Sequence, residues 1–299
     1  MNFCLSENES QKIISHYGPD FYNMLRKELA LYASKWDLDI LQFVDYYSVN
    51  CIFICHSKQF GDAVLKIGRP CKEVFTEVNA LREYNGSRFC RLYKSDIDNG
   101  IILIERIVPG TQLKAEKTLD KRLSVFSNLF NGLHIEPENA DIYPTYADWT
   151  KNITAYMSKR EDYKELYSYM KRANDICLSV CRSYTKKMLL HGDFHYENIL
   201  RNRNGSYTII DPKGVIGDPV FDVPRYILNE YENASSDQRY RKISYIFDYF
   251  EKSLNIPTII QKQCFFVDMT MAASWNVESG NKPDMDGIIF AENILDNWE

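Results

Sequence analysis

The chain has 299 residues and a formal net charge of −5, and 45% of its residues are hydrophobic against 26% charged. This balance is typical of a globular protein that is long enough for one large domain or two lobes. The negative charge gives no electrostatic support for a nucleic-acid partner. No apolar run approaches the ~18 residues of a membrane span, and the first residues lack the basic start and apolar core of a secretory signal. We therefore expect a cytoplasmic protein without a membrane partner.

The first third of the sequence changes from a helical to a strand period. Ser6 and Glu9 fit a capping box, and apolar residues then recur at helical spacing up to Trp36. Beyond Trp36, short apolar runs bounded by turn residues predict strands. The predicted strands are 40–44, 49–55, 63–67 and 101–104, with a turn at 57–61 and a helix at 73–84.

Lys66 lies within the third predicted strand, and Glu77 lies in the helix predicted after it. A lysine in a strand can simply point to solvent. In kinase architecture, however, a strand lysine contacts the α- and β-phosphates of the nucleotide, and a helix glutamate holds that lysine in place. The motif described below favours this second interpretation for Lys66 and Glu77. Glu73, one turn away, is the competing partner and is expected to face solvent.

The strand at 101–104 leads into a segment that ends with Pro109 and Gly110, which are typical of a crossing between lobes. Backbone groups of Glu105 and Ile107 could pair there with the edge of an adenine ring. The alternative is an ordinary strand-to-helix loop, and the spacing alone allows both.

The rest of the sequence predicts mostly helix. Apolar residues at helical spacing in 119–133 predict a helix whose apolar stripe belongs to the core. Further helix is predicted at 146–187, with at least one break, and at 222–298, with a break at 255–257. Cysteine pairs at helix or strand spacing, such as Cys177 and Cys181, are interpreted as small buried hydrophobic residues rather than metal ligands, because no His completes a compact zinc pattern.

The spacing of Asp193, Asn198 and Asp211 predicts the acidic end of a phosphoryl-transfer site. Apolar runs at 188–190 and 207–210 predict strands that would bring these three side chains to the same edge of a small sheet. Mg²⁺ prefers hard oxygen ligands and neutralises the charge of a transferred phosphoryl group. Asp211 would give the metal a negative charge, and Asn198 would give it a neutral amide oxygen. Asp193 is then left to accept a hydrogen bond from the attacking hydroxyl and orient it.

This segment resembles the H-G-D-x-x-x-x-N loop of the aminoglycoside phosphotransferase family, whose fold is similar to that of protein kinases. The matching residues are His191, Gly192, Asp193 and Asn198. Residues 210–219 look most like the branch that contains streptomycin 6-phosphotransferases and hydroxyurea-resistance kinases. Residues 133–134 and 274–280 extend the likeness, which covers most of the chain and is most specific between residues 191 and 222.

The resemblance implies an α+β, bilobal protein-kinase-like fold, with a small, mainly antiparallel β N-lobe that also carries helices and a larger, mainly helical C-lobe. We expect the nucleotide-binding lobe at 1–104, the hinge at 105–110 and the C-lobe with the substrate site at 111–299. The same resemblance gives His191 and Asp222 a structural role in bracing the catalytic loop.

The resemblance also implies an ATP-dependent small-molecule O-phosphotransferase that uses Mg²⁺. Asp193 would be the catalytic residue, and Asn198 and Asp211 would be the magnesium ligands. Lys66 and Glu77 would form the pair that holds the phosphates.

Two features depart from the protein kinases. The segment 44–50 has no glycine where protein kinases place a Gly-rich loop, so Ser48 or nearby backbone amides are predicted to contact phosphate. Only ten residues separate Asp211 from Asp222, which leaves no room for a long phosphorylated activation loop. A small-molecule substrate is therefore favoured over a protein.

A streptomycin-like aminoglycoside is the leading acceptor, which would make the chain an antibiotic-resistance kinase. Carboxylates such as Glu278 or Asp148 would suit the guanidinium groups of such an acceptor. A metabolic alcohol kinase acting on choline, homoserine or a sugar is the alternative, because fold does not determine substrate. A pseudokinase scaffold would be expected to lack a catalytic group, yet all five predicted groups are present. ATP versus GTP and the oligomeric state are left open by the sequence.

Overall fold

The computed structural model describes residues 3–45 and 50–297, and packing divides the chain into two units. The first unit is Met1–Thr111 with Arg201–Ile210, and the second is Gln112–Leu200 with Asp211–Glu299. The hinge predicted at 105–110 lies just before this division. The sequence did not indicate that the short segment 201–210 returns to the first unit.

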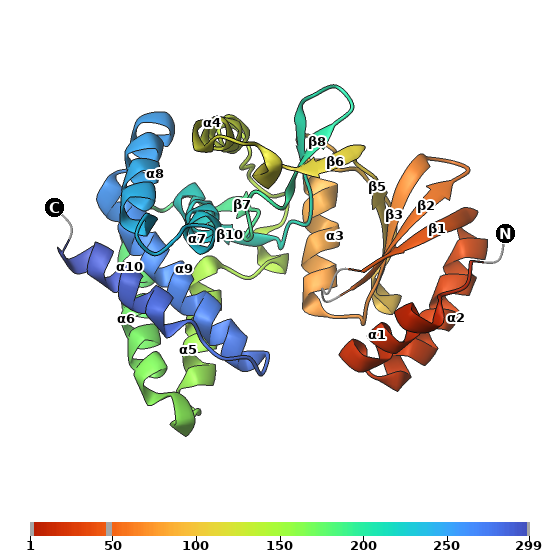
Figure 1. Ribbon diagram of the computed structural model, residues 1–299, viewed down its shortest axis with the longest axis horizontal. Coiled ribbons are helices and arrows are strands. Elements are labelled where there is room, and N and C mark those ends of the chain that lie inside the picture. Colours follow the sequence, from red (N-terminus) through yellow and green to blue (C-terminus); the bar gives the residue numbers. More distant parts are fainter. Residues whose placement is uncertain (1–2, 46–49, 298–299) are drawn as a thin grey trace. The chain divides into compact units, whose positions relative to one another are not determined.

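The first unit is built on a five-stranded antiparallel sheet with the strand order β1-β2-β3-β5-β4 (Figure 1). Its elements are α1 (Glu7–Tyr17), α2 (Pro19–Lys35), β1 (Leu38–Val44), β2 (Cys51–Ser57), β3 (Gly61–Ile67), α3 (Lys72–Tyr84), β4 (Leu92–Asp96) and β5 (Ile101–Glu105). The four predicted strands and the helix predicted at 73–84 are confirmed. The polar β4 was not predicted, because it lacks an apolar run.

The helical segment that ends near Trp36 consists of two helices rather than one. The predicted capping box is present, because the Ser6 hydroxyl accepts from the Glu9 N–H and the Glu9 carboxylate accepts from the Ser6 N–H. Gly18 then separates the helices with φ = 87°, a backbone conformation that favours glycine. Pro19 begins α2, where its fixed φ suits the first helical position.

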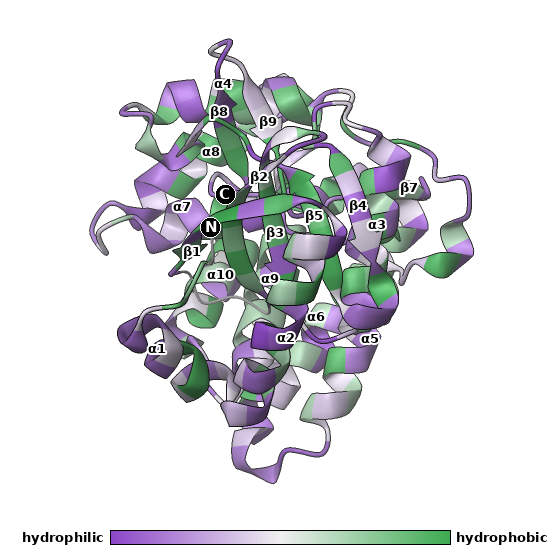
Figure 2. Ribbon diagram, turned by 90° about the vertical axis from the view of Figure 1, so that its right-hand side faces the viewer, coloured by the Kyte–Doolittle hydropathy of each residue, from purple (hydrophilic) through white to green (hydrophobic). Residues whose placement is uncertain are grey.

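Alternation along β3 places its side chains on opposite faces of the sheet. Leu65 and Ile67 are fully buried in the core that α1 and α2 form with one face. Lys66, between them, must point to the other face, where it meets Glu77 of α3. The central strands are mainly hydrophobic (Figure 2), and burying each large aliphatic side chain contributes roughly 1.5–3 kcal/mol.

The second unit is mostly helical. Its elements are α4 (Leu119–Phe130), α5 (Tyr146–Met157), α6 (Lys164–Ser183), β7 (Met188–Leu190), β10 (Val215–Gly217), α7 (Pro224–Glu232), α8 (Arg239–Leu254), α9 (Thr258–Glu278) and α10 (Met285–Asn297). The predicted breaks within 146–187 and at 255–257 are confirmed. No helix among the described residues is long and apolar enough to cross a membrane.

The small sheet predicted from the apolar runs at 188–190 and 207–210 is wrong. β7 pairs antiparallel with β10, and β9 (Tyr207–Ile209) belongs to another sheet, with the order β6-β8-β9. The remaining strands of that sheet are β6 (Pro109–Gln112) and β8 (Ile199–Asn202). Strand pairing is a long-range choice, so an apolar run predicts a strand without naming its neighbour.

Phe126 of α4 is the centre of an aromatic cluster in the second unit. Its ring centroid lies 4.6 Å from that of Phe194, 4.3 Å from that of Tyr226 and 5.1 Å from that of Phe250. Such pairs contribute roughly 0.5–1.5 kcal/mol each beyond area burial. Because Phe194 directly follows Asp193, the cluster anchors the loop that carries the catalytic candidate.

A buried ion-pair network joins α4, α7 and α8. The Glu230 carboxylate is 1% exposed and accepts from Arg122 at 2.7 and 3.0 Å, and Lys242 Nζ lies 2.6 Å from its second oxygen. Burial alone would raise the pKa of Glu230, but the hydrogen bonds and charges of Arg122 and Lys242 lower this pKa below its usual value. The two cations therefore stabilise the ionised carboxylate.

We expect Glu230→Gln to lower the free energy of unfolding at pH 7 by roughly 3 kcal/mol, because it leaves two half-buried cations without a counter-charge. A depressed pKa stabilises the fold above the ordinary value of 4.5 and loses that effect as the pH falls through the folded value. Urea unfolding at several pH values should therefore show the two proteins converging in acid. Glu165→Gln, at an exposed position, is the control. Equal losses of unfolding free energy in both variants would contradict a stabilising role of the network.

Candidate active site

The loop after β7 is shaped by Gly192 and braced by Asp222. Gly192 has φ = 78°, and a Cβ there would lie 2.7 Å from the Trp149 ring, so only glycine fits. The buried Asp222 carboxylate accepts the N–H of His191 at 2.8 Å and that of Gly192 at 2.7 Å. His134 Nε2 lies 2.9 Å from the same carboxylate. The loop backbone is therefore held before any substrate arrives.

Asp193 follows this brace, and its side chain is 27% exposed. Its Oδ1 lies 3.4 Å from Arg225 Nε, and its Oδ2 lies 3.6 Å from His195 Nε2. Burial alone would raise the pKa of Asp193. The hydrogen bond and charge of His195, followed by the charges of Arg225 and Lys213, outweigh burial and hold this pKa below its usual range. The carboxylate is thus ionised near neutral pH and can accept a hydrogen bond from a hydroxyl.

Asn198 is tied to the same loop by its amide nitrogen. Nδ2 donates to the Asp193 carbonyl at 3.0 Å and lies 3.2 Å from His195 Nε2. Because the nitrogen makes these contacts, Oδ1 is the atom that the side chain can offer to a cation. The side chain's position therefore suits the predicted role.

Asp211 adopts φ = 61°, a left-handed conformation that is uncommon for residues other than glycine, asparagine and aspartate. Strain of this kind clusters at functional sites. Lys213 Nζ lies 3.1 Å from Asp211 Oδ2, and the Lys213 N–H donates to the His191 carbonyl at 2.7 Å. That backbone bond joins the Asp211 segment to the catalytic loop.

The donor set fits a magnesium ion that keeps ligands from other molecules. Asn198 and Asp211 offer an amide oxygen and a carboxylate, the hard donors that Mg²⁺ prefers. No group of three or more His, Cys, Asp and Glu that could hold a metal occurs among residues 3–45 and 50–297. A closed protein cage is not what Mg²⁺ needs, because it usually binds one or two carboxylates together with phosphates and water.

In the first unit, Lys66 Nζ lies 2.6 Å from Glu77 Oε1, and the two side chains are 7% and 8% exposed. Glu73 is exposed on the same helix, as its spacing predicted. The Glu105 N–H donates to the Arg91 carbonyl at 2.8 Å. An adenine contact by Glu105 would therefore use its carbonyl.

Ile107 and Ser48 are the two other predicted nucleotide contacts. Ile107 is 9% exposed in the segment after β5. Ser48 lies outside the described residues, so its predicted phosphate contact stays a prediction.

Sequence reasoning missed Arg225, Asp268 and Lys213. The guanidinium of Arg225 bridges Asp193 and Asp268, which lies 3.0 Å from Arg225 Nη2. A signal for Asp268 existed, because it is an acid within the apolar run of α9, and an acid is almost never fully buried without a partner. Nothing in the sequence joined it to Arg225.

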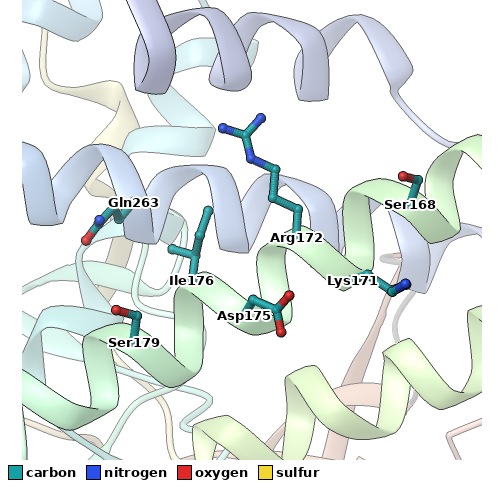
Figure 3. A pocket seen from close by; sticks show the side chains of 7 residues that line it. All are labelled: Ser168, Lys171, Arg172, Asp175, Ile176, Ser179 and Gln263. Carbon is teal, nitrogen blue, oxygen red and sulfur yellow. The ribbon is translucent and has the colours of Figure 1, made fainter.

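None of the predicted site residues lines the surface depression of ≈450 Å³ on α6. Figure 3 shows that its walls carry polar side chains, among them Arg172 and Asp175, with Gln263 contributed by α9. A second depression of ≈700 Å³, in the first unit, is lined by the N-terminal segment, α2 and β1. Neither depression belongs to the catalytic loop.

Comparison with known proteins decides the family. The model of the aminoglycoside/hydroxyurea antibiotic resistance kinases matches residues 47–280. The chain belongs to this kinase family. It is therefore a kinase-type phosphotransferase with an alcohol group as acceptor, as the motif predicted.

Relatives of this kinase cover most of its sequence. Streptomycin 6-kinase of Streptomyces griseus is 24% identical over 226 residues, which are 73% of this chain and 72% of the relative. Hydroxyurea phosphotransferase of Kitasatospora aureofaciens is 24% identical over 228 residues, which are 75% of this chain and 66% of that one.

Solved structures confirm the kinase-like α+β fold. Choline kinase LicA from Streptococcus pneumoniae has a TM-score of 0.62 at 16% identity and covers 91% of this chain and 97% of its own. Aminoglycoside phosphotransferase APH(4)-Ia, in a ternary complex with ADP and hygromycin B, has a TM-score of 0.59 at 13% identity and covers 89% and 96%. These likenesses concern the fold alone.

Proposed function

We propose that this kinase transfers the γ-phosphate of ATP to a hydroxyl of a small cationic acceptor, with streptomycin-like aminoglycosides as the leading class. The observation that carries the proposal is Asp193 on a braced loop beside Arg225 and His195, with Asn198 hydrogen-bonded to its carbonyl. The backbone hydrogen bond from the Lys213 N–H to the His191 carbonyl connects the segment that carries Asp211 to the same loop. Relatives named as streptomycin kinases support the acceptor class.

In the proposed reaction, Asp193 accepts a hydrogen bond from the acceptor hydroxyl and orients its oxygen toward the phosphorus. Catalysis of this kind is mostly positioning and electrostatic stabilisation. Mg²⁺, when bound, would neutralise charge on the phosphate oxygens, and Asn198 and Asp211 would hold it. Lys66, kept in place by Glu77, would contact the α- and β-phosphates. Ser48, the Glu105 carbonyl and Ile107 remain the proposed contacts for the rest of the nucleotide.

A group of carboxylates supports a cationic acceptor. Burial raises the pKa of Glu232, and the negative charges of Asp284 and Glu197 add to that effect, while Arg225 and His195 oppose it. The charges that act on Glu232 therefore include two acids and the two residues, Arg225 and His195, that contact Asp193. A cationic acceptor would offset the negative charge that acts on Glu232, although Lys114 already pairs with Glu197 at 2.6 Å.

The two carboxylates suggested by the sequence are placed differently. Asp148 Oδ2 accepts the N–H and hydroxyl of Thr145 in the capping box of α5, so this carboxylate has a structural role. Glu278 is exposed at the end of α9. Glu232 is exposed as well, but the charges of Arg225 and His195, which both contact Asp193, act on its carboxylate, so it is the better candidate for recognising an acceptor.

A coupled assay of ADP release across acceptors tests the proposal. The panel should contain streptomycin, other aminoglycosides, choline, homoserine and simple sugars, each with ATP and with GTP. Turnover of streptomycin together with a growth advantage on the drug would support the proposed function. Turnover of choline alone would overturn the antibiotic assignment and favour the metabolic alternative.

Glu232→Gln is expected to raise KM for the cationic acceptor roughly three- to tenfold with little change in kcat, because one attractive charge near the surface contributes about 1 kcal/mol. The increase should shrink at high salt. Glu278→Gln is the matched control, since that carboxylate is exposed as Glu232 is but lies at the end of α9, and its removal should leave KM unchanged. If Glu232→Gln and Glu278→Gln have equal KM values, Glu232 does not take part in acceptor recognition.

A further inference from the structure

Arg225 is a buried guanidinium between two acids that lie on different segments. It lies in the first turn of α7, and its side chain is 16% exposed. Nη2 donates to Asp268 Oδ1 at 3.0 Å, and Nε lies 3.4 Å from Asp193 Oδ1. A cation withdrawn from water needs such counter-charges, because removing it from solvent costs several kcal/mol.

The hydrogen bonding of this arginine is asymmetric. Asp268 is 4% exposed and lies on α9, a helix that packs on α7. Arg225 Nε has no hydrogen-bond acceptor in the described structure although Asp193 Oδ1 is its near neighbour. Asp268 therefore fixes the guanidinium by a hydrogen bond, and the Nε side of the guanidinium contacts the Asp193 carboxylate as an ion pair without a hydrogen bond.

The ring of Trp275 limits the movement of the guanidinium further. Its centroid lies 5.8 Å from Arg225 Cζ, within the range of a cation–π contact. The Trp149 ring lies 5.8 Å from that of Trp275 and touches the position where Gly192 would carry a Cβ. Arg225 and the backbone of the catalytic loop therefore pack on the same aromatic pair, Trp275 and Trp149.

We propose that Arg225 is a positioning residue for phosphoryl transfer, which Asp268 holds in place and which fixes the rotation of the Asp193 carboxylate. This inference rests on the proposed function. Arg225 faces Oδ1 of Asp193, so Oδ2, near His195, is the oxygen that receives the acceptor hydroxyl. The argument is geometric: Asp193 lies on a loop and can rotate, and a misplacement of ~1 Å can reduce a rate ~10²-fold.

The test compares Arg225→Met with Arg172→Met in ADP release from MgATP and streptomycin. Arg172 is a matched control, because it also pairs with two carboxylates, Glu292 and Asp296, and lies over the Phe266 ring. We expect Arg225→Met to lower kcat roughly 10- to 100-fold while KM for ATP stays within about twofold. Arg172→Met should keep the wild-type kcat, whatever its effect on thermal stability.

Conservative variants separate positioning from simple structural support. Arg225→Lys keeps the charge and should recover part of the lost kcat, and Asp268→Asn should lower kcat less than Arg225→Met, since an amide oxygen still accepts from Nη2. Thermal unfolding gives the folded fraction of each variant. A kcat that falls only in proportion to that fraction, or a folded Arg225→Met with wild-type kcat, overturns the inference.

The outcome for the wild type separates this inference from the proposed function. If streptomycin is not turned over, the first acceptor that is turned over in the panel takes its place in the assay. A wild type that phosphorylates nothing in the panel overturns the proposed function and this inference with it. A wild type that is active, with an equally active Arg225→Met, overturns the inference alone.

Discussion

Asp193→Ala is expected to lower kcat by roughly 10²–10⁴-fold while leaving affinity for MgATP nearly unchanged. The carboxylate is ionised and partly exposed, and its backbone is braced by hydrogen bonds that do not involve its side chain. Its removal should therefore cost orientation of the acceptor hydroxyl and one counter-charge of Arg225, which keeps Asp268, while the backbone of the loop stays in place. Steady-state ADP release gives kcat, and titration with a fluorescent ATP analogue gives nucleotide affinity.

Asp175→Ala, an exposed acid on α6, provides the control for Asp193→Ala and should retain wild-type kcat. A pseudokinase scaffold predicts a different pattern. If Asp193→Ala binds MgATP normally and leaves a cellular phenotype intact, scaffolding rather than phosphoryl transfer is the function. Unchanged turnover would equally remove Asp193 from the mechanism.

Asp211→Asn should lower kcat/KM by roughly 10²–10³-fold and raise the Mg²⁺ concentration that half-saturates the enzyme. Removal of one anionic ligand weakens a charge interaction that contributes several kcal/mol to transition-state stabilisation. Asparagine tolerates φ = 61° as well as aspartate does, so the backbone at this position is preserved and the effect can be assigned to the charge. ADP release measured against Mg²⁺ concentration is the readout.

Asp37→Asn is a matched control for Asp211→Asn. Asp37 also adopts a left-handed conformation, with φ = 52°, and its side chain is 70% exposed. This variant should show the wild-type dependence on Mg²⁺. If Asp211→Asn shows the same dependence as Asp37→Asn, Asp211 does not bind the metal.

Asp193, Arg225 and Asp268 have different proposed roles within the second unit. In the proposed mechanism, Asp193 would contact the acceptor, Arg225 would set the angle of the Asp193 carboxylate, and Asp268 holds Arg225 by an ion pair at 3.0 Å. Burial raises the pKa of Asp268, and the charge of Arg225 opposes this effect. The ion pair with Arg225 explains why an acid is buried on α9.

Short-range features of this kinase follow from the sequence alone. The capping box at Ser6, the alternation around Lys66 and the helix breaks depend on residues a few positions apart, so periodicity and capping chemistry reveal them. The family, the fold class and the type of reaction also followed, because the motif around Asp193 concentrates several chemical requirements within one loop. The roles of the individual site residues stay predictions for the experiments above.

Only the tertiary structure decided the long-range partners. The pairing of β7 with β10, the return of residues 201–210 to the first unit, and the contact of Arg225 with Asp268 all join segments that no local pattern connects. The physical reason is that helix and strand signals arise from neighbours along the chain. The partner of a strand or a buried charge, by contrast, depends on how the whole chain packs.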